Sequence, residues 1–170
     1  SSDLINNGVT IKVNNGVNLR SEGGSVSNQN SGAINNDGNV YLDLGYTQNT
    51  GATYTGGAAS WLWFEGALNQ SLNGDAALNI ARLRVDNGNR LVLGNQVNVS
   101  KDVDLTNNGN IELGAFDLVM TPGATIANYD ANNYIITNST GVLQQEVGTV
   151  VIFPVGNSTY NPATLNNIGT

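Results

Sequence analysis

Four aromatic residues are the best candidates for a ligand site in this sequence. Trp61 and Trp63 lie in its most aromatic cluster, Trp61-Leu62-Trp63-Phe64, and Tyr46 and Tyr54 precede that cluster. Exposed aromatic rings can stack on sugar rings, so these residues could form a saccharide-binding platform. In an extended strand the two tryptophans share one face, because side chains alternate. Filling of the core is the alternative for all four, and we favour it.

Acidic residues offer a second kind of chemistry. Asp102 and Asp104 flank Val103, so on a strand both carboxylates lie on one face, where they could ligate Ca²⁺. Calcium needs about six to eight oxygen ligands, and the Gly-Asp nonapeptide of calcium-binding β-rolls does not occur here. We therefore expect a solvated outward face and no metal site.

Catalysis by paired carboxylates would need two acids in one cleft. The acids that could meet across neighbouring repeats are Asp43, Glu65, Glu112 and Asp117. Nothing in the sequence singles out a pair among them. The chain has no histidine and no cysteine, which excludes a serine triad of the usual form and makes a tetrahedral zinc site untenable. We expect no enzyme and no cofactor.

The strands and turns expected to position these residues recur at a regular interval along the sequence. Short apolar alternations, separated by Asn-Gly or Gly turns, return after about 20 residues: residues 85–88 match 105–109, and Leu93-Gly94 matches Leu113-Gly114. A unit of this size cannot bury its own apolar face, so the units must stack. Isolated hairpins are the alternative for Asn-Gly turns. We predict an all-β protein, a right-handed parallel β-helix (solenoid) with about 21 residues per coil, Val, Ile and Leu inside, and Asn and Gly at the corners.

The domain organisation follows from breaks in this rhythm. We expect the solenoid at residues 1–143, with a projecting loop, or a weakly paired segment, near 45–60 where Gly and Thr interrupt the alternation. Residues 144–170 contain Pro154 and Pro162, and proline belongs at sheet edges. We expect a capping or exit segment there, one that could lead to a further domain.

Charge and hydropathy exclude two classes of partner. The net charge is −7, and the six cations form no dense basic stripe. Nucleic-acid binding needs concentrated positive charge, so we expect no nucleic acid. No apolar run approaches the roughly 20 residues of a membrane helix, so we expect no membrane insertion.

Several phrases of the sequence resemble one family, the Asn/Gly-rich β-solenoid repeats of large secreted, adhesin-like surface proteins of Bacteroidetes, exported by the type IX system. The phrases that carry the resemblance are residues 78–87, Leu91-Val92-Leu93-Gly94, residues 110–114, residues 134–143, Phe153-Pro154-Val155-Gly156, and Trp63 to Gly66 followed by Gln70 and Gly74. The resemblance implies an extracellular location at the bacterial cell surface and partners among further domains of a larger surface protein.

The expected function combines fold and resemblance. We expect an extracellular structural or adhesive surface protein without catalysis, acting as a rigid stalk or as a filament subunit. Both ends of a solenoid are open strand edges, which can template another coil, so end-to-end self-association is the expected partnership. The alternative is a carbohydrate-binding or polysaccharide-degrading module on the same scaffold, with glycans as partners.

Overall fold

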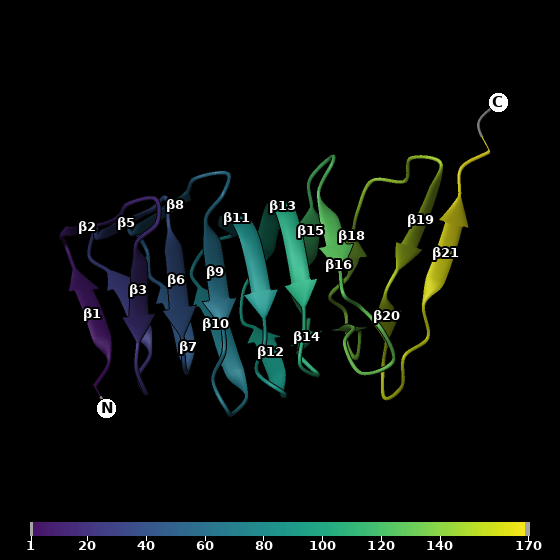
Figure 1. Cartoon of the computed structure of the whole chain (residues 1–170), viewed down its shortest axis with the longest axis horizontal. Coiled ribbons are helices and arrows are strands. Elements are labelled where there is room, and N and C mark those ends of the chain that lie inside the picture. Colours follow the sequence, from purple (N-terminus) through teal and green to yellow (C-terminus); the bar gives the residue numbers. More distant parts are fainter. Residues whose placement is uncertain (1, 169–170) are drawn as a thin grey trace.

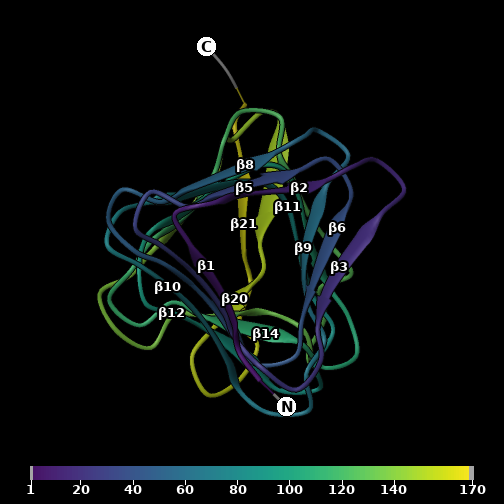
Figure 2. The same ribbon diagram turned by 90° about the vertical axis from the view of Figure 1, so that its left-hand side faces the viewer.

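The computed structural model describes residues 2–168 and shows a rod of about seven coils, with the two ends of the chain at opposite ends of the rod (Figure 1). Seen along the axis, the coils enclose a triangular cross-section with three strand-lined sides, here called faces A, B and C (Figure 2). The regular structure of the described residues consists of strands, β1 to β21. The prediction of an all-β parallel solenoid is confirmed, and its right-handedness stays a prediction.

Each face is a stack of parallel strands. Face A is continuous and contains β1 (Leu4–Asn7), β4 (Val26–Gln29), β7 (Gly45–Gln48), β10 (Gln70–Gly74), β12 (Arg90–Leu93), β14 (Asn110–Glu112), β17 (Ile135–Ile136) and β20 (Val155–Gly156). Face B begins with β2 (Thr10–Val13), β5 (Ala33–Asn36) and β8 (Thr53–Gly56). Face C begins with β3 (Asn18–Ser21), β6 (Asn39–Leu42) and β9 (Trp61–Phe64).

In the fourth and fifth coils, one strand covers two faces. The long strands β11 (Leu78–Val85) and β13 (Val97–Leu105) each begin on face B, bend, and end on face C, where β11 pairs with β9. Their mutual register shifts at this bend, between Ile80 and Arg82. In the sixth coil the two halves are separate strands again, β15 (Leu118–Met120) and β16 (Thr125–Ala127), both paired with β13. β18 (Leu143–Gln144) follows β15.

The interior of the rod is filled as the sequence predicts. Parallel pairing in constant register places each residue over its equivalent in the neighbouring coil, as with Val40 and Leu62 or Leu62 and Leu83. Rows of Val, Ile and Leu therefore run along the axis and form one core with Phe64 and Tyr46. No stack can bury its apolar side without this register, because a shift by one residue would turn the rows outward.

Buried asparagines satisfy the backbone where the chain leaves face A. The Nδ2 of Asn6 donates to Asn28 Oδ1 at 2.8 Å and to the Ala33 carbonyl oxygen, and Asn28 Nδ2 donates to the Thr53 carbonyl oxygen at 2.8 Å. A buried carbonyl without a partner costs free energy, so these amides stabilise the turn between faces. The interpretation of the Asn-rich segments as stacked turn residues is confirmed here.

Two less regular segments can be compared with the expected domain organisation. Residues 45–60, expected to form a projecting loop or a weakly paired segment, contain β7 and β8, which occupy half of that segment and pair within the stack. Its Thr and Gly residues obscured the alternation of the strands. In residues 144–170, β20 continues face A, whereas β19 (Val150–Phe153) and β21 (Ala163–Asn166) form an antiparallel hairpin at the C-terminal end.

Neighbouring coils approach most closely at a few glycines. A Cβ added to Gly66 would overlap the backbone carbonyl oxygen of Asp43 in the preceding coil. Backbone atoms cannot move aside as a side-chain end can, so only glycine fits this corner.

We predict that Gly66→Ala lowers the free energy of unfolding by about 2 kcal/mol or more, because the added methyl group forces two coils apart. Equilibrium denaturation in urea measures the change. Gly148→Ala is the matched control, because no atom lies within 4 Å of its added Cβ, and it should unfold like the parent. Equal stability of the two variants would contradict the close packing of these coils.

Candidate functional site

The outer surface of face C carries two rows of aromatic and charged side chains. Register places one residue of each strand above the next, so the rows run along the rod axis. One row is Asn18, Asn39, Trp61, Arg82, Asp102 and Thr125, and the other is Arg20, Tyr41, Trp63, Arg84, Asp104 and Ala127. This surface therefore combines aromatic, cationic and anionic side chains in register.

Trp63 is enclosed between its two neighbours in this row. The ring centroids of Tyr41 and Trp63 are 4.7 Å apart, and the guanidinium carbon of Arg84 lies 4.1 Å from the Trp63 ring centroid. Arg20 in turn lies over the Tyr41 ring at 4.5 Å. A cation over an aromatic face is attracted by the ring quadrupole, so the row is a chain of favourable stacking contacts.

Trp61 has a looser arrangement, with the Arg82 guanidinium carbon 5.4 Å from its ring centroid. A sugar ring would need a free aromatic face, but the guanidinium groups of Arg82 and Arg84 already cover one face of each tryptophan. The rows therefore present ring edges and charged groups to solvent. This geometry supports a role of the tryptophans in stabilising face C by stacking more than a role as a saccharide-binding platform.

The two tyrosines of the expected platform lie inside the rod. Tyr46 and Tyr54 pack edge to face with ring centroids 5.9 Å apart, and both side chains are buried. The Tyr46 hydroxyl donates to Gln48 Oε1 at 2.9 Å, and the Tyr54 hydroxyl accepts from Asn36 Nδ2 at 2.9 Å. The structure thus separates the four predicted residues into two outward tryptophans and two core tyrosines.

Burial changes the acidity of both phenols. It raises the pKa of Tyr46, which the hydrogen bond with Asn28 lowers in part, and it raises the pKa of Tyr54 to about 12 against the opposing effect of Asn36. The neutral phenol is favoured because the phenolate would lose its hydration.

The acidic residues of face C serve as partners of the arginines. Asp102 Oδ2 lies 3.3 Å from Arg82 and Asp104 Oδ2 lies 3.5 Å from Arg84. The other carboxylate oxygens accept hydrogen bonds from Thr125 and Asn128. Both aspartates are thus outward, as the sequence predicts, and within the described residues no group of three or more Asp, Glu, His or Cys is arranged to hold a metal ion.

The four acids weighed for glycoside hydrolysis do not share one site. Glu112 binds Arg90 and Asn138, and Asp117 accepts from the Val142 backbone nitrogen. Only Asp43 and Glu65 are neighbours. Burial raises the pKa of Glu65, its ion pair with Arg20 opposes this, and Asp43 and Asp86 add to the rise.

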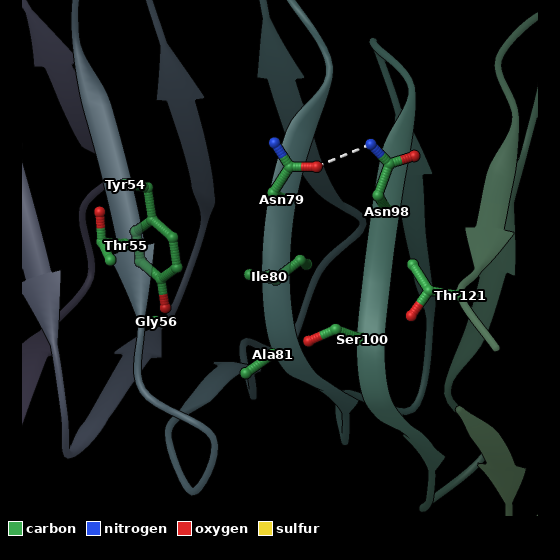
Figure 3. A pocket seen from close by; sticks show the side chains of 9 residues that line it. All are labelled: Tyr54, Thr55, Gly56, Asn79, Ile80, Ala81, Asn98, Ser100 and Thr121. Atoms are coloured by element: carbon green, nitrogen blue, oxygen red, sulfur yellow. Dashed lines mark hydrogen bonds between the residues drawn. The ribbon is translucent and has the colours of Figure 1, made fainter. Parts of the chain in front are cut away.

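A cleft on face B went unnoticed in the sequence. It has a volume of about 340 Å³, lies between β8 and the first half of β11, and is lined by Tyr54, Thr55, Gly56, Asn79, Ile80, Ala81, Asn98, Ser100 and Thr121 (Figure 3). Of the expected platform only Tyr54 reaches it. The sequence feature that could have indicated the cleft is a difference in the length of the turn between faces B and C. Four residues separate β8 from β9, whereas the next repeat runs from Leu78 to Val85 without a turn.

Comparison with protein-family models, with curated proteins and with solved structures gave no match for this chain. The described residues form no helix with the length and apolar character needed to cross a membrane.

We predict a measurable coupling between Trp63 and Arg84 in a double-mutant cycle with Trp63→Leu and Arg84→Gln. Stacking at 4.1 Å should contribute about 0.5–1 kcal/mol of interaction free energy, obtained from urea unfolding of the parent, the two single variants and the double variant. The Trp61/Arg82 cycle is the control, and its 5.4 Å separation should give a smaller value. Equal coupling energies in the two cycles, or no coupling in either, would contradict the proposed stacking of Arg84 on Trp63.

We also predict that stability falls as the pH rises from about 10 to about 12. The folded pKa of Tyr54 lies above its ordinary value of 10.0, so its stabilising contribution is complete below pH 10 and is lost as pH passes through 12. Urea midpoints measured across this range test it. Tyr54→Phe should show a shallower decline, and a slope identical to that of the parent would contradict the assignment.

Proposed function

We propose that this protein is a non-catalytic structural element of a bacterial cell surface, a rigid β-solenoid that assembles end to end with a second copy of itself. The resemblance to Asn/Gly-rich surface repeats supports the location. Face A, continuous from β1 to β20, supports the rigidity, because hydrogen bonds between all eight strands join one end to the other.

One observation supports the assembly: none of the described residues covers the core of the first coil at its N-terminal end. Leu4, Ile11 and Leu19 occupy the same interior rows as Val26, Ile34 and Val40 of the next coil. The second set is fully buried, whereas the first is only partly buried against the core. Apolar rows that end at an open edge favour a further coil.

Apolar side chains are exposed at both ends of the rod. Ile5, Val9 and Val17 are about half exposed in the first coil. At the other end Val150 and Leu165 of the β19–β21 hairpin are also exposed. Leu165 lines an open cavity of about 440 Å³ between residues 137–143 and the hairpin. Contact between these two surfaces would be heterologous, and a heterologous contact that does not close into a ring produces a filament.

We predict that the parent protein forms uniform filaments in negative-stain electron microscopy and that Ile5→Pro abolishes them. The backbone nitrogens of Leu4 and Gly8 donate to the carbonyl oxygens of Ser25 and Gln29 in the second coil, so by the alternation along a strand the nitrogen of Ile5 faces the open edge. Proline there removes a donor that only a second copy could use.

Ile5→Ala is the matched control, because it removes the same exposed side chain and keeps the N–H. It should still form filaments, although shorter ones than the parent. Circular dichroism must show that both variants are folded. Short separate rods from the parent, or filaments from Ile5→Pro, would contradict assembly through the β1 edge.

A further inference from the structure

The wall of the solenoid is interrupted at one place. β8 pairs with β5 on one side, but among the described residues no strand pairs with its other side, and the first half of β11 pairs only with β13. Faces A and C continue past this point through β7–β10 and β9–β11. The face B cleft, whose lining residues are drawn in Figure 3, is thus a gap in one sheet, and the sheets of faces A and C continue past it.

Backbone polar groups face this gap from both sides. The nitrogens of Thr53 and Gly57 donate to carbonyl oxygens of the β5 coil, so the alternation turns the peptide groups of Tyr54 and Gly56 toward β11. The Leu78 nitrogen donates to Gln96, which likewise turns the peptide group of Asn79 toward β8. Both edges therefore offer donors and acceptors that the sheet does not use.

Side chains add neutral polar groups on the outer side of the cleft. Asn98 Nδ2 donates to Asn79 Oδ1 at 2.7 Å, and this bond leaves the Asn79 amide nitrogen turned to the β8 side (Figure 3). Ser100 and Thr121 contribute hydroxyl groups, and the Tyr54 ring adds apolar surface. No lining residue carries a charge. Paired amides and hydroxyls beside an apolar ring suit a ligand rich in hydroxyl groups.

A peptide strand does not fit in the gap. An inserted strand would hold its two neighbours roughly 9–10 Å apart, twice the usual spacing. Cα atoms of β8 and β11 approach within 8 Å, and the Ala81 nitrogen lies only 3.5 Å from where a Cβ of Gly56 would be. The occupant must therefore be smaller than a strand and enter from the side.

We propose that the face B cleft binds a neutral saccharide unit, with the Asn79 amide and the free peptide groups of both edges hydrogen-bonded to its hydroxyl groups. Anionic sugars are disfavoured because no lining cation would compensate their desolvation. The site lies on the side of the rod, away from the ends, so this inference goes beyond assembly and does not depend on it.

The test is titration of the ¹⁵N-labelled full chain with neutral oligosaccharides (cellohexaose, maltohexaose, mannohexaose and chitotetraose), followed by side-chain amide NMR and calorimetry. Hyaluronan and polygalacturonate serve as anionic probes, and a Thr/Val hexapeptide serves as the strand probe. We expect at least one neutral sugar to bind and to shift the amide signals of Asn79 and Asn98, with no shift from the anionic or peptide probes.

Variants locate the binding site. Asn79→Ala combined with Ser100→Ala should weaken binding by about tenfold or more, since each removed hydrogen bond contributes on that scale. Asn35→Ala, on the outer side of β5 in the same face, and Trp61→Ala, on face C, should bind like the parent. Four results would overturn the proposal: no neutral sugar bound by the parent, equal binding of anionic sugars, shifts only from the peptide, or loss of binding in Trp61→Ala alone.

Discussion

Axial register is the constraint on which the rest of this structure depends. Parallel strands about 4.8 Å apart place each side chain directly over its equivalent in the next coil, so the contacts of a residue are made mainly with the equivalent residues of the two neighbouring coils. Inside the rod, rows of Val, Ile and Leu are therefore stabilised by apolar contact, as in Leu62 over Val40. On the outer surface, rows in which aromatic, cationic and anionic side chains follow one another are stabilised, as in Trp63, Arg84 and Asp104. One geometric rule accounts for both the core and the surface pattern.

The same register explains why amides are buried in an otherwise apolar interior. Where the chain leaves one face for the next, the ladder ends and carbonyl groups point to no strand. Asn36 bridges such a corner: its Nδ2 reaches the Tyr54 hydroxyl and the Trp61 carbonyl oxygen, and its Oδ1 accepts from Gly38. Gln70 does the same one corner later, with the Leu42 carbonyl oxygen and the Gly66 nitrogen as partners. Each amide joins coils, so a single loss affects two turns of the rod.

Period and turn chemistry were readable in the sequence because both are local. Asn107 and Asn108 have φ values of 52° and 59°, the left-handed conformation expected of an Asn-Asn-Gly turn. The alternation of Trp61 to Phe64 correctly placed the two tryptophans on one side of that strand, but this is the outer side and not the core side that we favoured. Which residues stack on Trp63 depends on spacings of about 21 residues that insertions change, and the sequence does not mark those insertions. Tyr46 and Tyr54 fill the core, as we favoured, although Thr and Gly around them hide strands β7 and β8 in the sequence.

The cleft of face B follows from a mismatch between two kinds of corner. The third coil turns from face B to face C through residues 57–60, where the Ser60 nitrogen donates to the Gly57 carbonyl oxygen. The fourth coil makes the same passage by a bend within β11 near Ala81. Because the two turns differ, the strand segments that precede them do not lie in register on face B, and β8 and the first half of β11 are not paired. After the turn, β9 and the second half of β11 are paired on face C. A solenoid built from identical coils would have no such opening. Variation in corner length is therefore the means by which a uniform rod acquires a distinct site on its side.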